Sequence, residues 1–188
     1  MKIEDTPLDG VKLLTPKRFP DSRGFFAETY AAQPLADAGL VATFVQDNHS
    51  LSHVVGTLRG LHFQMPPHGQ VKLVRCGRGA LFDVAVDVRR GSPTYGQWFG
   101  AELSAENGCQ LWIPQGFAHG FVTRLPDTEI IYKCSDYYAP QTEGAIAWND
   151  PDIGIDWDMG VTTPHLSDKD AIAPPLVAFD TPFNYSAR

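Results

Sequence analysis

The stretch ALFDVAVDV, which spans residues 80–88, is the clearest structural signal in the chain. Its apolar side chains recur at every second position. One face would carry Phe82, Val84, Val86 and Val88, and the opposite face Asp83, Ala85 and Asp87. A period of two is the spacing of a β-strand and differs from the 3.6-residue period of a helix. The stretch therefore predicts a β-strand with two faces of different character.

Similar short runs lie on both sides of this strand, among the chain's 17 glycines and 15 prolines. They predict further strands over residues 58–64, 71–76, 100–103, 111–113, 120–123 and 129–137. Many short strands joined by turns are typical of a sandwich or barrel, and a closed double-sheet barrel has few exposed edges. We therefore expect an all-β, mainly antiparallel barrel that can hold one small ligand, with short helices at 33–38 and near Ser167.

Composition places the chain among ordinary single-domain proteins. It has 188 residues, of which 43% are apolar and 20% charged, and a net charge of -7. We expect one domain over residues 1–188. The sequence shows no basic stripe for nucleic acid, no apolar run of bilayer length and no secretory signal. Three widely separated cysteines do not form a disulfide framework. These features predict a cytoplasmic protein without nucleic-acid or membrane partners.

Two of the predicted strands carry polar residues that apolar packing would not select. In LRGLHFQ (58–64), alternation places His62 and Arg59 on opposite faces. In VKLVRC (71–76), Lys72 interrupts an apolar run. His62 has a structural interpretation as a histidine with satisfied hydrogen bonds, and Lys72 has one as a rim lysine that reaches water. If these strands line a barrel, both side chains are available for chemistry.

Three further segments allow both a structural and a functional interpretation. LWIPQGFAHGF (111–121) has the Pro-x-Gly-x-x-His pattern of cupin barrels, in which the histidine, here His119, points into the barrel. Tyr132 lies in an apolar strand, either as a core tyrosine or as a proton donor inside a cavity. Ser167 and Asp170 have the spacing of a helix capping box, so Asp170 could serve a helix instead of a reaction.

Ten motifs, in order along nearly the whole chain, resemble the dTDP-4-dehydrorhamnose 3,5-epimerase family. Ten motifs with matching spacing are far more specific than any one of them. They are DSRGFFAE (21–28), FVQDNHS (44–50), LRGLHFQ (58–64), VKLVRC (71–76), FDVAVDVR (82–89), FGAELSAEN (99–107), LWIPQGFAHGF (111–121), YKCSDYY (132–138), EGAIAWND (143–150) and LSDKDA (166–171).

The resemblance implies a cupin-like double-stranded β-helix, or jelly roll, that forms a homodimer and uses no cofactor and no metal. An N-terminal extension of about residues 1–50 would contribute to the dimer and to the partner's site. A C-terminal segment of about residues 160–188 would pack on the barrel.

The resemblance also implies roles for individual side chains. His62 matches the catalytic base and Asp170 the carboxylate that supports it, with Asp168 as a second candidate for that support. Tyr132 matches the opposing acid, and Lys72 a catalytic position near the sugar C4 oxygen. The implied substrate-binding residues are Arg23, Phe26, Glu28, Gln46, Asn48, Arg59, His119, Tyr138, Glu143 and Lys169, of which Arg23, Phe26 and Glu28 would reach the partner's site.

These residue types suit the implied reaction, the epimerisation of dTDP-4-dehydro-6-deoxy-D-glucose at C3 and C5 to dTDP-4-dehydro-L-rhamnose. Both carbons adjoin the C4 ketone, so removal of a proton gives an enolate with charge on the C4 oxygen. The cation of Lys72 would stabilise that charge. Neutral His62 suits the base on one face of the sugar, and the phenol of Tyr132 the acid on the other.

Several alternatives stay open at this point. A metal-dependent cupin usually carries His-x-His, but here the sequence reads His62–Phe63–Gln64, which leaves too few ligands. A sugar-nucleotide-binding cupin without catalysis and an epimerase of C3 alone or C5 alone for an antibiotic deoxysugar are further alternatives. For Arg59 and His62 to share a site, either a bulge near Gly60 is needed or Arg59 must reach around a strand edge.

Overall fold

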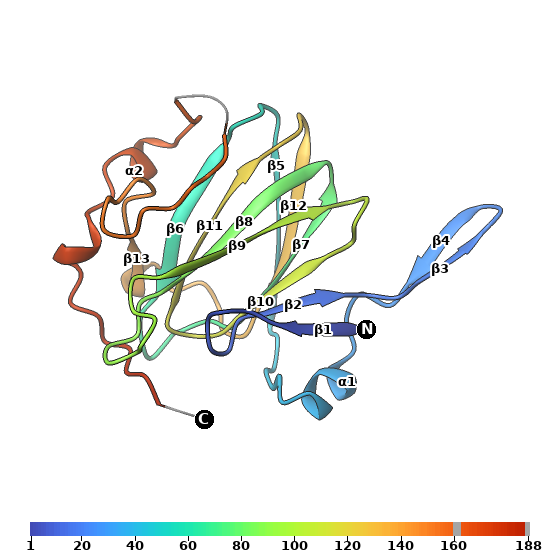
Figure 1. Ribbon diagram of the computed structural model, residues 1–188, viewed down its shortest axis with the longest axis horizontal. Coiled ribbons are helices and arrows are strands. Elements are labelled where there is room, and N and C mark those ends of the chain that lie inside the picture. Colours follow the sequence, from blue (N-terminus) through green and yellow to red (C-terminus); the bar gives the residue numbers. More distant parts are fainter. Residues whose placement is uncertain (160–162, 187–188) are drawn as a thin grey trace.

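The chain folds into two antiparallel sheets and a projecting hairpin, as the computed structural model of residues 1–159 and 163–186 shows (Figure 1). The six-stranded sheet has the order β1-β2-β10-β7-β12-β5 and the five-stranded sheet the order β13-β6-β11-β8-β9. The strands are β1 (Lys2–Asp5), β2 (Lys12–Thr15), β3 (Arg18–Asp21), β4 (Gly24–Ala27), β5 (Gln46–Ser52), β6 (Leu58–Gln64), β7 (Lys72–Arg78), β8 (Ala80–Asp87), β9 (Trp98–Ser104), β10 (Gln110–Ile113), β11 (Phe117–Thr123), β12 (Thr128–Cys134) and β13 (Glu143–Ala145).

The strand predicted over residues 80–88 is confirmed as β8, and both of its faces are buried. Val84 and Val86 lie on the outer face of the five-stranded sheet, in a core with Trp157 and Leu176 from the C-terminal part of the chain. Residues on the other face, such as Ala85, belong to an inner core between the two sheets. Full burial of a valine-sized side chain stabilises the fold by about 1.5–3 kcal/mol, so this strand anchors both cores.

The inner core lies between the two sheets and holds them together. Val74 and Ile130 contribute from the six-stranded sheet, and Leu103 and Phe121 from the five-stranded sheet. A third core lies on the outer face of the six-stranded sheet and includes Leu35 of helix α1 (Ala32–Asp37). The expected all-β double-sheet barrel with short peripheral helices is therefore confirmed.

The other short helices lie near the chain's C-terminal part. They are η1 (Pro140–Thr142), α2 (Asp168–Ala171) and η2 (Leu176–Ala178). Figure 1 shows α2 beside the end of the five-stranded sheet that holds β6. Residues 160–162 and 187–188 of the predicted C-terminal segment lie outside the described residues. No helix in the described part is long and apolar enough to cross a membrane.

Six strands were not expected from the sequence: β1 to β5 and β13. Strand β5, with the sequence QDNHSLS, shows the reason. Its residues are polar on both faces, so no apolar period marks it, and it forms because its backbone pairs with β12 from Gln46 opposite Cys134 to Ser52 opposite Thr128. The expected strand over 129–137 was also too long, since β12 ends at Cys134.

Strands β3 and β4 form a hairpin that extends away from both sheets (Figure 1). Three of its aromatic side chains are exposed although they are apolar: Phe19 is 50% exposed, Phe25 56% and Phe26 70%. A cluster of exposed aromatic residues on a projecting hairpin is typical of a surface that another protein covers.

Candidate active site

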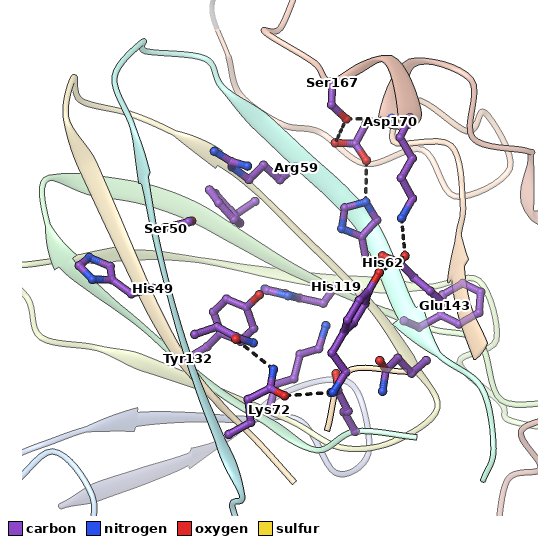
Figure 2. Close-up of a pocket in the computed structure, with 18 residues that line it drawn as sticks. His49, Ser50, Arg59, His62, Lys72, His119, Tyr132, Glu143, Ser167 and Asp170 are labelled. Atoms are coloured by element: carbon purple, nitrogen blue, oxygen red, sulfur yellow. Dashed lines mark hydrogen bonds and ion pairs between the residues drawn. The ribbon is translucent and has the colours of Figure 1, made fainter. Parts of the chain in front are cut away.

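One deep pocket opens between the two sheets, with a volume of ≈ 520 Å³ (Figure 2). Both sheets supply side chains to it, because inward positions of facing strands converge inside a barrel. It brings together eleven of the residues that the sequence predicted: Gln46, Asn48, Arg59, His62, Lys72, His119, Tyr132, Tyr138, Glu143, Lys169 and Asp170. Its lining also includes His49, Ser50 and Ser167, which the sequence analysis did not assign to the site.

A β-bulge in β6 explains how Arg59 and His62 share this pocket. His119 of β11 pairs with His62, and Phe121 pairs with Arg59, so a step of two residues on β11 matches a step of three on β6. The extra residue shifts the alternation by one position. Of the two routes considered for Arg59, the structure therefore has the bulge.

Gly60 makes this bulge possible. Its φ is +121°, and a Cβ at this position would lie 2.6 Å from the Cα of Gly120 and 2.7 Å from the carbonyl oxygen of His119. A residue with a side chain would therefore meet both backbone strain and a direct clash with β11. This glycine sets the position of His62 relative to Arg59.

His62 is paired with a carboxylate from the C-terminal part of the chain. Its Nε2 lies 2.5 Å from Oδ1 of Asp170, which comes from α2. The side chain of His62 is 32% exposed and that of Asp170 is 4% exposed. Asp168, the other candidate for this position, is exposed and does not line the pocket. With the Nε2 proton donated to an ionised carboxylate, the lone pair of the neutral ring lies on Nδ1.

The carboxylate of Asp170 is held by several donors. Burial alone would raise its pKa, but hydrogen bonds from His62, the Ser167 hydroxyl and the backbone of Gly60 together bring its pKa below the ordinary value. An ionised Asp170 can fix the tautomer of His62 and stabilise its protonated form.

A second histidine lies directly opposite His62 on the neighbouring strand. His119 Nε2 is 2.8 Å from Oδ1 of Asp83 on β8. Its side chain is 8% exposed, and Asp83 is fully buried. Burial lowers the pKa of His119 despite the nearby carboxylate, so this ring is neutral at neutral pH. Asp83 was not predicted as a site residue, because nothing in the sequence shows which strand would lie beside β11.

Lys72 and Tyr132 enter the pocket from the opposite sheet, on β7 and β12. Burial lowers the pKa of Lys72, while the nearby Cys134, Asp83 and Glu143 act in the opposite direction. Burial also raises the pKa of Tyr132, which keeps its phenol protonated at neutral pH. Figure 2 shows Tyr132 and His62 on different walls of the same pocket. The site thus has an imidazole, a phenol and an amine around one cavity.

Three side chains form a hydrogen-bonded network at the rim of the pocket. Glu143 Oε2 accepts a hydrogen bond from the Tyr138 hydroxyl at 3.0 Å and lies 2.6 Å from Nζ of Lys169. Arg59 is exposed, and its contacts with Ser52 and with the carbonyl of Leu51 are long, at 3.4–3.5 Å. Its guanidinium is therefore available to an anionic ligand at the mouth.

Arg23, Phe26 and Glu28 do not line this pocket. Arg23 and Phe26 lie on the projecting hairpin, where the Arg23 side chain is 88% exposed and forms an ion pair with the nearby Asp21. Within the described residues, no group of three or more His, Cys, Asp or Glu side chains is placed to hold a metal ion.

The chain is similar to known proteins over most of its length. The family model for dTDP-4-dehydrorhamnose 3,5-epimerase matches residues 5–178. Enzymes of that name from Salmonella typhimurium and Sinorhizobium fredii are 54% and 51% identical, over 94% and 98% of this chain and 96% and 94% of theirs.

A solved epimerase from Legionella pneumophila, in complex with dTDP-4-keto-L-rhamnose, superposes with a TM-score of 0.94 at 46% identity, covering 99% of each chain. This likeness extends the all-β assignment to the cupin-like fold that the motifs implied. Because the sequence match, the fold and the shared length agree, the chain belongs to the dTDP-4-dehydrorhamnose 3,5-epimerase family.

Proposed function

We propose that this protein epimerises dTDP-4-dehydro-6-deoxy-D-glucose at C3 and C5 and releases dTDP-4-dehydro-L-rhamnose. The observation that carries the proposal is the pocket between the sheets, where His62 and Tyr132 lie on opposite walls. Inversion of a carbon needs a base on one face and a proton donor on the other, and this pocket offers one of each.

The reaction begins with His62 as the base. Its Nδ1 lone pair takes a proton from the carbon next to the ketone, and Asp170 stabilises the imidazolium that forms. The electron pair of the broken C–H bond moves to the C4 oxygen, giving an enolate. Lys72 stabilises that oxygen as its charge develops, a contribution of about 10²–10³ in rate for one such donor.

Tyr132 then returns a proton to the same carbon from the opposite face. The phenol is protonated before the reaction because burial raises its pKa, and an enolate is basic enough to accept its proton. One C–H bond is broken and one is formed, so no oxidant or reductant is involved. His62 then returns its proton to solvent and the tyrosinate of Tyr132 takes one up, after which a second cycle inverts the other carbon in the same way.

The nucleotide is bound toward the mouth of the pocket. Arg59 suits the diphosphate because its guanidinium donates paired hydrogen bonds to phosphate oxygens. Gln46 and Asn48 lie on the edge strand β5, where their side chains bond to each other at 3.0 Å, and the exposed Tyr138 lines the same pocket. These groups suit the deoxythymidine part.

We infer that two copies of the chain form a homodimer in which each hairpin completes the partner's site. The exposed Phe25 and Phe26, together with Arg23, extend from the body and do not reach their own pocket. An arginine beside aromatic rings is the chemistry that a nucleoside diphosphate needs. The hairpin of a second copy would therefore add these groups to the mouth.

Proton exchange tests the activity. In D₂O with dTDP-4-dehydro-6-deoxy-D-glucose, we expect NMR to show deuterium entering at both C3 and C5 together with the rhamnose configuration. Tyr132→Phe is expected to retain exchange but to slow inversion by about 10²-fold. Deuterium exchange at only one carbon would show that the protein is a mono-epimerase. Exchange at neither carbon would show that it binds the sugar nucleotide without catalysis.

Subunit complementation tests the hairpin. Arg23→Ala and His62→Ala are each expected to be nearly inactive alone. After the two proteins are unfolded together and refolded, half of the dimers are mixed, and each mixed dimer has one site with both groups intact. The mixture should regain about a quarter of the wild-type activity. No recovery in dimers shown to be mixed would contradict the shared site.

A further inference from the structure

Ser167 has a role in the structure beyond the helix cap that its sequence context predicts. Its Oγ accepts a hydrogen bond from the backbone N–H of Asp170 at 3.1 Å, which is the expected cap of α2. The same hydroxyl donates to Oδ2 of Asp170 at 2.9 Å. One side chain therefore holds both the backbone and the carboxylate of Asp170.

The second hydrogen bond completes a three-residue chain. Asp170 Oδ1 bonds to His62 Nε2 at 2.5 Å, while Oδ2 takes the Ser167 proton. Both oxygens of a carboxylate that is only 4% exposed are thus occupied. A hydrogen bond to a charged group is stronger than one between neutral groups, which favours one orientation of the carboxylate over others.

The element that carries Asp170 needs such support. Helix α2 has four residues, and a single turn of helix has little stability of its own. Lys169, the residue before Asp170, is joined to Glu143 on β13, but both groups are partly exposed, and an exposed ion pair contributes little to stability. Besides His62 and the backbone of Gly60, the Ser167 hydroxyl is the donor that acts on the carboxylate itself, and Figure 2 shows it beside Asp170.

We propose that Ser167 is a positioning residue for the reaction: its hydroxyl fixes the Asp170 carboxylate so that the proton of His62 stays on Nε2 and Nδ1 faces the substrate as the base. The hydroxyl donates its hydrogen bond to Oδ2, so Oδ1 remains free to accept from the imidazole. The inference rests on the proposed role of His62 as the base.

Three substitutions separate the hydroxyl donor from the helix cap. Ser167→Thr keeps both functions. Ser167→Gly keeps most of the capping preference, because glycine is nearly as favourable as serine at an N-cap, whereas alanine is clearly unfavourable there. Neither glycine nor alanine can donate a proton to Oδ2. Asp168→Ala, one residue along the same helix and outside the pocket, is the matched control.

We expect Ser167→Thr and Asp168→Ala to exchange C3 and C5 protons within about twofold of the wild-type rate. Ser167→Gly and Ser167→Ala should both lose about tenfold in kcat, at the low end for a hydrogen bond to a charged group, with little change in KM.

The ¹⁵N NMR signals of His62 give a readout that does not depend on activity. In wild-type protein we expect the proton on Nε2, and in Ser167→Gly a mixture of tautomers. If Ser167→Gly has the wild-type rate and tautomer while Ser167→Ala is impaired, Ser167 is only a cap and the proposal is wrong. Wild-type behaviour of both variants would also overturn it. A wild-type protein that exchanges no protons would instead contradict the proposed function.

Discussion

His62 and His119 lie opposite each other on the neighbouring strands β6 and β11, and each ring is hydrogen-bonded to a buried carboxylate, yet the two pairs differ in the exposure of the ring and in the hydrogen bonds of the carboxylate. The His62 ring is about one third exposed, and both oxygens of Asp170 have partners. The His119 ring is buried, and Oδ2 of Asp83 has no hydrogen-bond partner among the described side chains and backbone.

The difference shows how one sheet can hold two histidines with different chemistry. Charging a buried ring is unfavourable, and burial lowers the pKa of His119. The His62 ring is partly exposed and faces a carboxylate whose two oxygens both have hydrogen-bond partners. We therefore propose proton transfer for His62 and an uncharged binding role for His119.

The largest effects on activity are expected when one imidazole is removed at a time. His62→Ala is expected to slow deuterium exchange at C3 and C5 by about 10²–10⁴-fold, the usual contribution of a general base. His119→Ala should cost about tenfold, the value of one hydrogen bond. Both variants should still bind dTDP in calorimetry. Equal losses of exchange would contradict the division of roles.

Replacing each carboxylate by its amide gives a matched test of intermediate size. Asp170→Asn can donate to Nε2 of His62 and so favours the wrong tautomer, which we expect to lower kcat by about 10²–10⁴-fold. Asp83→Asn changes the partner of His119, which we do not expect to take the substrate proton. This variant should therefore lower kcat by about tenfold or less. A larger loss for Asp83→Asn than for Asp170→Asn would reverse our assignment.

The smallest expected effect is on the pH dependence of stability. The folded pKa of His119 is below its ordinary value of 6.5, so protonation favours the unfolded chain and stability falls as the pH drops below about 6.5. The folded pKa of Asp170 is below 3.8, so its contribution is present above that value and is lost as the pH falls through the folded pKa.

Thermal unfolding of two variants separates these contributions. Between pH 7 and 5, His119→Asn should lose less Tm than wild type, by about 2–4 °C if the difference is near 1 kcal/mol. Between pH 5 and 3, Asp170→Asn should show the smaller loss. If plots of Tm against pH for wild type and His119→Asn are parallel above pH 5, burial does not lower the pKa of this histidine.

Much of the fold was predictable because its signals are local. The period of two in residues 80–88 and the Pro-x-Gly turn before His119 each depend on a few consecutive residues. The possible bulge near Gly60 could also be inferred, because strict alternation separated Arg59 from His62. The polar strand β5 was not predictable, since its position depends on pairing with β12.

Seven strands, the family motifs and the residue types that acid–base chemistry requires can be recognised in the sequence alone. Only the folded chain selects Asp170 over Asp168 as the partner of His62, 108 positions away, and pairs His119 with Asp83, 36 positions away. It also gave Ser167 a second hydrogen bond beyond its cap. These contacts form because elements that are distant in the sequence pack together. A short stretch of residues does not show which elements those will be.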